Sequence, residues 1–258
     1  MSAGNRIAFS KPTRTDADTE ALLGGFRAAG YDGLQLKMNQ FTPWLDDAGA
    51  FRARYPEPGV ASAVIFFDVP DAAGEERLAR VIEFAGAVGS ERVVYCQNRT
   101  HEGVDRALLE AYATSLSGHG RRARELGVAL SLHHHFDQPV MTPDDVRAFF
   151  GAVQTADGSP LVGLTVDTAH LAKSGVEDIP GFIAEFAGVI DNIHLKDYAD
   201  GQWRLFGQGD LDLVGILSAL RDVGYPGWIC VDEESSASLE DGLRVSRDWL
   251  DSHPPART

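Results

Sequence analysis

The chain has 258 residues, a formal net charge of −15, 44% hydrophobic and 24% charged residues, which is an ordinary balance for a globular protein. Nucleic acids and anionic membrane surfaces bind clusters of Lys and Arg, so an acidic chain without such a cluster is a poor candidate for either partner. Without a run of 18 apolar residues or an apolar N-terminal signal segment, we expect a cytoplasmic protein that binds a small molecule or a metal cation.

Eight short apolar segments alternate with longer segments of helical period. They are Arg6–Ser10, Gly33–Lys37, Ala61–Phe67, Arg92–Cys96, Val128–Leu132, Val162–Val166, Asn192–Leu195 and Trp228–Val231. Nearly continuous apolar runs are typical of parallel strands that are covered on both faces. Cys96 and Cys230 fall in two of these strands, and we expect both to be buried, reduced thiols.

The segments between the strands have the apolar spacing of helices. They are Thr15–Ala29, Glu75–Val88, Arg106–Leu126, Pro143–Val153, Ile179–Phe186, Leu213–Val223 and Leu239–Asp251. Thr15 or Asp16 can cap the first helix, and Thr142 before Pro143 marks another helix start. A glycine follows four of the helical segments and is expected to adopt the left-handed conformation there: Gly30, Gly89, Gly127 and Gly224.

Strand–helix units repeated eight times favour an α/β fold, a closed (β/α)8 TIM barrel that forms a single domain over residues 1–258. An open, doubly wound sheet is the alternative. The chain has no GxGxxG after its first strand and no GxxxxGK[ST] anywhere. The sequence therefore gives no support for a dinucleotide site or a P-loop.

Histidines and acidic residues follow four consecutive predicted strands. They are His133, His134 and His135 after the fifth strand, Asp167 and His170 after the sixth, His194 and Lys196 at the end of the seventh, and Asp232, Glu233 and Glu234 after the eighth. In a barrel, the C-terminal ends of the strands meet at one mouth, where catalysis takes place. Singly, each group has a simpler explanation, such as a solvated loop or a helix cap. Together they would be costly to bury without a cation, which predicts a metal site.

These residues make the chain resemble the sugar phosphate isomerase/epimerase superfamily, the xylose isomerase-like barrels. That group includes inosose dehydratases, ketose 3-epimerases and endonuclease IV-type enzymes. The similarity spans nearly the whole chain and is carried by Tyr31–Leu36, Val166–His170, Asn192–Asp197, Gly207–Asp212 and Gly224–Asp232. The pairing of D-x-x-H with H-x-K-D is its most specific part.

The resemblance implies one divalent metal ion bound by His133, Asp167, His194 and Asp232. The family usually has glutamates at the first and last of these positions, so both are departures. Strand alternation places Asp232 and Glu234 on one face, so either can be the last ligand. Two imidazoles and two carboxylates favour Mn2+ or Zn2+, ahead of Co2+, Fe2+ or Mg2+. A closed structural zinc site is the alternative, although carboxylate sites at a barrel mouth usually keep an open position.

The implied chemistry is removal of an α-proton beside a carbonyl, with the ion acting as a Lewis acid on the resulting enediolate. His170 would hydrogen-bond a substrate hydroxyl. Lys196 would neutralise negative charge or protonate a leaving hydroxyl, unless it instead forms a salt bridge with Asp197 or another carboxylate at the rim. His135 and Glu234 are the candidate bases.

Three further residues are candidates for contact with the substrate: Lys37, Gln97 and Trp203. Lys37 and Gln97 follow the second and fourth strands, and Trp203 lies in a loop after the seventh. Lysine and glutamine would bind hydroxyl groups, whereas the indole would stack on a sugar face. The alternative for Trp203 is ordinary packing of the loop against the barrel.

The sequence therefore predicts an isomerase or epimerase of a keto-sugar or cyclitol, with a dehydratase of the inosose or dehydroshikimate type as the alternative. His133 and Lys196 favour the dehydratase branch. A DNA-repair endonuclease would need three metals and a D-x-H after the seventh strand, where Asp210–Asp212 stands instead. A non-catalytic metal-binding or ligand-binding barrel is a reading from a different class. A homodimer or homotetramer is compatible with the sequence, although no local motif indicates one.

Overall fold

The protein is described here by a computed structural model, which covers residues 5–254. Eight parallel strands close into a barrel in the order β1-β12-β9-β8-β5-β4-β3-β2. Their bounds are β1 Ile7–Ser10, β2 Gly33–Leu36, β3 Ala63–Asp68, β4 Arg92–Gln97, β5 Ala129–His133, β8 Gly163–Asp167, β9 Ile190–Leu195 and β12 Trp228–Asp232. Because β1 pairs with both β2 and β12, the sheet is closed, and the predicted barrel is confirmed against the open sheet.

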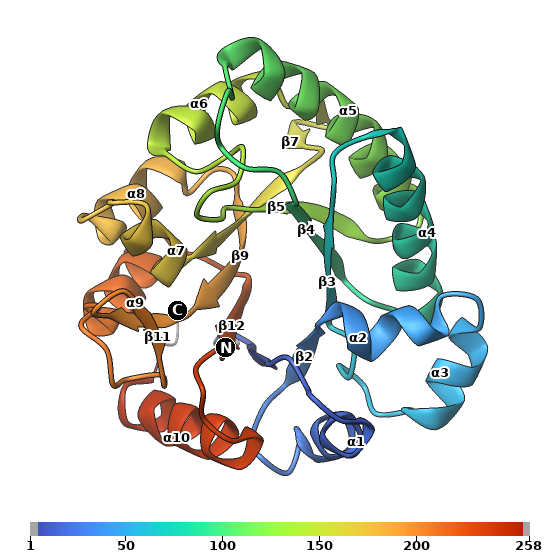
Figure 1. The fold of residues 1–258 in the computed structure, drawn as a ribbon, viewed down its shortest axis with the longest axis vertical. Helices are drawn as coiled ribbons and strands as arrows, with labels where there is room; N and C mark the ends of the chain where they lie inside the picture. Colours follow the sequence, from blue (N-terminus) through green and yellow to red (C-terminus); the bar gives the residue numbers. More distant parts are fainter. Residues whose placement is uncertain (1–4, 255–258) are drawn as a thin grey trace.

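Helices surround the strands on the outside of the barrel (Figure 1). The longer ones are α1 Asp16–Gly25, α4 Ala72–Val88, α5 Arg106–Glu125, α6 Pro143–Ala152, α8 Ile179–Phe186, α9 Leu213–Asp222 and α10 Leu239–Ser252. Thr15 and Thr142 form capping boxes at the starts of α1 and α6, as their side chains predict. The four glycines that follow helical segments all have positive φ angles, between 64° and 88°, so their predicted left-handed conformation is confirmed.

Several short elements in the loops were not predicted. They are α2 Met38–Phe41, the 3-10 helix η1 Thr42–Trp44, α3 Ala48–Arg54, α7 Thr168–Lys173, and the small hairpins β6 Thr155–Ala156 with β7 Ser159–Pro160 and β10 Asp197–Ala199 with β11 Gln202–Arg204. Elements of two to seven residues are too short to show a hydrophobic period. Three of them, α2, α7 and the β10–β11 hairpin, contribute to the barrel mouth.

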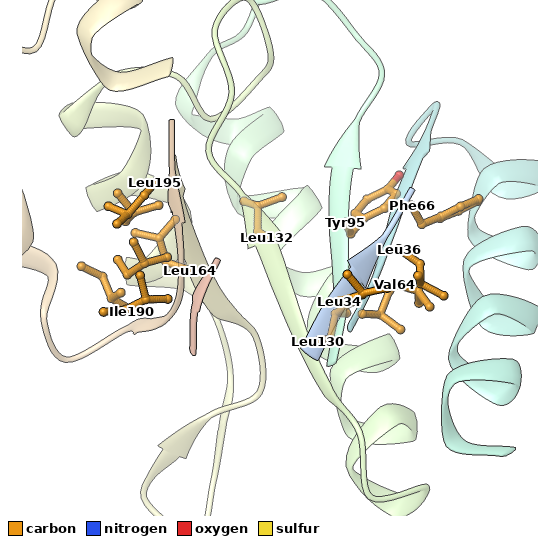
Figure 2. Close-up of a cluster of buried hydrophobic side chains, with 14 of the residues drawn as sticks. Leu34, Leu36, Val64, Phe66, Tyr95, Leu130, Leu132, Leu164, Ile190 and Leu195 are labelled. Atoms are coloured by element: carbon orange, nitrogen blue, oxygen red, sulfur yellow. The ribbon is translucent and has the colours of Figure 1, made fainter. Parts of the chain in front are cut away.

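The strands bury different kinds of residue on their two faces. The helix-facing side is apolar, and Figure 2 shows part of this layer, including Leu132, Leu164 and Leu195. Some inward-facing positions are also apolar, and Cys96 and Cys230 occupy two of them as buried free thiols, as expected. Elsewhere the barrel interior is polar and includes the buried side chains of Gln35, Ser131, Thr165 and Asn192. Among residues 5–254, no helix is long and apolar enough to span a bilayer.

Candidate metal centre at the barrel mouth

Three neighbouring strands bring His133, Asp167 and His194 together at their C-terminal ends. One potential ligand atom from each lies within 4.8 Å of the others, and all three residues are buried. Nε2 of His133 is 3.1 Å from Nδ1 of His194 and 3.7 Å from Oδ2 of Asp167. Ligands that each lie about 2.1 Å from one ion are roughly 3–3.5 Å apart. The three donors therefore fit a single divalent ion.

Asp167 divides its two oxygens between folding and the centre. Its Oδ1 accepts hydrogen bonds from the backbone N–H groups of Ala169 and His170, and so caps α7. Its Oδ2 is buried, makes no hydrogen bond among the described residues, and lies 3.7 Å from Nε2 of His133 and 3.2 Å from Nζ of Lys196. Helix capping and ligation are alternative roles for Asp167, and the geometry accommodates both. A buried carboxylate oxygen without a hydrogen bond is the kind of donor that a cation satisfies.

Asp232 and Glu234 extend the cluster from the end of β12. Both line the same cavity, whereas Glu233 points away and lies 3.5 Å from Lys11, as strand alternation predicts. Oδ2 of Asp232 is 3.8 Å from Nδ1 of His194. Asp232 thus lies directly beside His194. Glu234 is closer to solvent, since 29% of its side chain is exposed against 2% for Asp232.

Two lysines neutralise much of this acidic charge. Nζ of Lys196 lies 2.8 Å from Asp232 Oδ2, 2.8 Å from Glu234 Oε2 and 3.2 Å from Asp167 Oδ2. Nζ of Lys37 lies 2.6 Å from Asp232 Oδ1 and 2.7 Å from Glu234 Oε1. Three carboxylates against two ammonium groups leave one negative charge in a buried site. A divalent cation is electrostatically suited to such a surplus.

The carboxylates differ in how strongly these charges act on them. Burial raises the pKa of Asp167 to about 6, against the opposing effect of Lys196. Burial alone would also raise the pKa of Glu234, but Lys37 and Lys196 lower it to about 2. The pKa of Asp232 is held well below its usual range by Lys196 and Lys37, despite its burial. Glu234 and Asp232 are therefore ionised at neutral pH.

His135 and His170 complete the histidine group. Their ring centroids are 3.8 Å apart, and both line the cavity. Burial lowers the pKa of His135 to about 4 and that of His170 well below its ordinary value. Nδ1 of His135 lies 2.7 Å from the carbonyl oxygen of Phe136. Since a carbonyl only accepts, Nδ1 carries the proton, and Nε2 of the neutral ring keeps its lone pair.

The cavity at this mouth has a volume of about 190 Å³ and two chemically different walls. The charged and imidazole groups come from β5, β9 and β12, from the segments that follow β2, β5, β9 and β12, and from α7, which follows β8. The other wall is apolar and had not been predicted: it consists of Met38, Ile65, Phe67 and Cys96. Pockets for drug-sized ligands measure about 300–1,000 Å³, so this cavity suits a smaller molecule with one polar edge and one apolar face.

Two predicted substrate contacts lie outside the cavity lining. Gln97 is buried, but Cys96 is the β4 residue that lines the cavity, so alternation turns Gln97 toward the helices. Trp203, on the β10–β11 hairpin, packs against two residues that line the cavity. The centroid of its ring is 4.8 Å from that of His170 and 5.2 Å from Nζ of Lys196. The remaining candidates line the cavity directly, except Asp167, which contacts the lining residues His133 and Lys196.

Asp197 organises the loop that carries Trp203. Its carboxylate accepts hydrogen bonds from the backbone N–H groups of Gly207 and Gly209, at 3.0 and 2.8 Å. A Cβ on Gly209 would lie 2.3 Å from Oδ1 of Asp197, so only glycine fits there. A salt bridge to Asp197 or to another carboxylate at the rim was the alternative role for Lys196. In the structure, Lys196 pairs with three carboxylates of the mouth, which are those of Asp167, Asp232 and Glu234, so an ion pair of this kind is present.

The protein is thus a TIM barrel with a His/Asp/His cluster, a candidate metal centre, at the C-terminal mouth of its strands. The chain belongs to the xylose isomerase-like TIM barrel family, whose sequence model matches residues 26–253. The predicted family membership is thereby confirmed.

Individual proteins show the same similarity. Inosose dehydratase from Lacticaseibacillus casei is 31% identical over 144 residues, which cover 48% of this chain and 47% of that protein. The chain thus spans about half the length of the curated relatives it matches. An L-ribulose 3-epimerase structure superimposes with a TM-score of 0.78 and 19% identity over 96% of this chain and 94% of that one. The IolI protein with a bound zinc atom gives a TM-score of 0.71 and 18% identity, covering 95% and 97% of the two chains.

Proposed function

We propose that the protein is a divalent-metal-dependent enzyme that removes an α-proton from a neutral keto-cyclitol or keto-sugar. The observation that carries this proposal is the convergence of His133, Asp167 and His194, whose buried donor atoms lie within 4.8 Å of one another at the mouth of the barrel. Asp232 is the nearest further donor. A bound ion would polarise the substrate carbonyl as a Lewis acid.

The charges in the cavity support an uncharged substrate. Both lysines that line it are already within 2.8 Å of carboxylate oxygens. The lining of this cavity, within residues 5–254, includes no arginine. An anionic substrate such as a carboxylated ring would therefore lack a free cationic partner. The apolar wall around Phe67 and Ile65 suits the C–H face of a ring, while hydroxyl groups meet the polar wall.

His135 is the residue that we assign to proton removal. Its Nε2 has a free lone pair, whereas the oxygens of Glu234 lie 2.7 and 2.8 Å from two ammonium groups that reduce their basicity. Glu234 instead holds Lys196, with Oε2 2.8 Å from Nζ, and the N–H groups of Lys196 would hydrogen-bond a departing hydroxyl. His170 would orient a second hydroxyl beside His135.

We favour dehydration as the overall reaction. The relatives named inosose dehydratase support this outcome, and Lys196 offers donors for the leaving group. Epimerisation is the second candidate, because His135 and Glu234 reach the cavity from opposite sides of the barrel, after β5 and β12. A base on each face of the substrate is what inversion requires.

The test is to follow a keto-inositol by NMR in D2O with metal-loaded and chelator-treated protein. Loss of water supports dehydration, and solvent exchange with inversion supports epimerisation. His135→Gln should lower turnover by about 10²- to 10⁴-fold, as expected for loss of a general base, and should leave metal affinity unchanged. A wild-type protein that binds no Mn2+ or Zn2+ and does not exchange any α-proton would overturn the proposal.

A further inference from the structure

A continuous chain of side-chain hydrogen bonds runs through the barrel interior from the mouth to the opposite end. It begins at His194, whose Nε2 lies 2.8 Å from Oε1 of Gln35, and it ends at Asp191, whose Oδ1 lies 2.6 Å from Oγ of Ser131. Between these ends stand Asn192 and Thr165. Five of these six residues are at most 1% exposed, and the sixth, Asp191, reaches the surface.

The direction of every hydrogen bond in this chain follows from its last member. Asp191 is ion-paired with Arg92, with Nε–Oδ2 at 3.4 Å, and a carboxylate only accepts. Ser131 therefore gives its single hydroxyl proton to Asp191. Ser131 and Thr165 are 2.6 Å apart, so the Thr165 hydroxyl must donate to Ser131. Thr165 Oγ1 is then left as an acceptor for the next residue.

The two amides must follow the same direction. Asn192 has to present its NH2 group to Thr165, because its carbonyl oxygen there would face another acceptor; the Nδ2–Oγ1 distance is 3.3 Å. Oδ1 of Asn192 is then available to accept from Nε2 of Gln35 at 2.8 Å, while Nδ2 donates back to Gln35 Oε1 at 3.0 Å. Oε1 of Gln35 consequently faces His194 as an acceptor.

His194 must therefore carry its proton on Nε2. Its Nδ1 keeps the lone pair and points to the cluster, 3.1 Å from His133 and 3.8 Å from Asp232. We infer that the Asp191 carboxylate, at the N-terminal end of the barrel, fixes the tautomer of His194 at the mouth through Ser131, Thr165, Asn192 and Gln35. These are positioning residues, and their role in metal binding rests on the proposed function.

Two local features let Asp191 reach the interior. Leu164 of β8 pairs with Ile190, and Thr165 pairs with Asn192, so Asp191 is the extra residue of a bulge in β9. Consecutive strand residues normally face opposite sides, and the bulge removes that constraint for Asp191 and Asn192. Gly163 provides the space, because a Cβ there would lie 2.1 Å from Cγ of Asp191.

The test measures the tautomer directly in metal-free protein. Histidine labelled with ¹⁵N gives distinct shifts for protonated and unprotonated ring nitrogens, and His194→Gln identifies the resonances of His194. Wild-type protein in chelator should show a protonated Nε2 and a bare Nδ1. Asp191→Asn can donate to Ser131 and so permits the reversed chain; the Nδ1-protonated form should then appear. Ser131→Ala removes the link between Asp191 and Thr165 and should have the same effect.

Ser117→Ala is the matched control, since it removes a buried hydroxyl on α5 that belongs to another set of hydrogen bonds. It should leave the His194 signals unchanged. Affinity for Mn2+ or Zn2+ should fall by about 10- to 100-fold in the Asp191 and Ser131 variants, as for other partners of metal-binding histidines. Unchanged His194 signals in both variants would overturn the inference. Failure of the wild type to bind metal would overturn the proposed function instead.

Discussion

Nζ of Lys196 lies 2.8 Å from Oδ2 of Asp232, the same oxygen that faces the His133–His194 pair. An internal ammonium group thus neutralises a carboxylate that we assign to the metal. In the metal-free protein, this contact compensates a charge that would otherwise be buried without a partner. An ion held by the proposed ligands would share Asp232 with Lys196. Under the proposed function, Lys196 would therefore link stability, metal affinity and catalysis.

Lys196→Met should destabilise the metal-free protein by about 3–5 kcal/mol, because removing one member of a buried ion-paired group leaves uncompensated charge. Mn2+ or Zn2+ should bind the variant more tightly than the wild type, since one positive charge is gone, and should restore part of the lost stability. Urea unfolding with and without metal measures both effects. Equal stability of the two proteins in chelator would contradict this role of Lys196.

Glu234→Gln should identify the ligand on β12. If Asp232 is the ligand, as its distance to His194 indicates, the variant keeps wild-type affinity for the ion. Turnover should nevertheless fall about tenfold or more, because Lys196 loses a partner that holds it toward the substrate. Titration calorimetry and steady-state kinetics give the two quantities. Glu240→Gln, an exposed change in the first turn of α10, is the control. A large loss of metal affinity would make Glu234 the ligand.

Asp167→Asn should separate helix capping from ligation. An asparagine oxygen can still accept from the N–H groups of Ala169 and His170, whereas Oδ2 is replaced by a group that cannot bind a cation. We expect a loss of metal binding with a change in unfolding free energy below about 2 kcal/mol. Asp167→Ala removes both functions. Its unfolding free energy should be lower than that of Asp167→Asn by about 0.5–2 kcal/mol, as is usual for loss of a helix cap. Equal destabilisation by both variants would show that the cap contributes little.

Acid should destabilise the protein through its buried histidines. Burial lowers the pKa of His134 to about 4 in the folded protein, whereas an unfolded histidine titrates near 6.5. The unfolded state therefore binds more protons between these values. The stability is complete above about pH 6.5 and falls as the pH drops toward 4, by on the order of 3 kcal/mol for this residue.

Urea unfolding between pH 7 and about pH 4.5 measures this dependence. His134→Gln should give a shallower decline than the wild type, because one of the protonating groups is gone. His119→Gln, on the half-buried surface of α5, controls for the loss of an imidazole. The same direction holds for His135 and His194, whose pKa values burial lowers to about 4 and about 3. Parallel curves for the wild type and His134→Gln would refute the prediction.

The barrel and most of the mouth could be predicted from the sequence because their signals are local. Each strand is a short apolar run, and the chemical groups stand where the runs end. Alternation after β12 correctly separated Glu233 from Asp232 and Glu234. Such patterns depend on residues two or three apart and do not require knowledge of the tertiary structure.

Other features depend on the register between strands and could not be predicted. A strand with apolar residues on both faces does not reveal which residues point inward, and Gln97 was therefore assigned to the mouth that Cys96 in fact lines. Gln35 was overlooked, although a buried amide within an apolar strand is a usable signal. The bulge at Asp191 has no local pattern at all, because it is defined only by pairing with β8.

Deleting Asp191 would leave β9 with regular alternation, since Ile190 already faces the helices and Asn192 already faces inward. The alternation of β9 therefore does not require Asp191. A β9 strand shortened by this residue would keep the architecture and lose the carboxylate that orients the interior amide pair through Ser131 and Thr165.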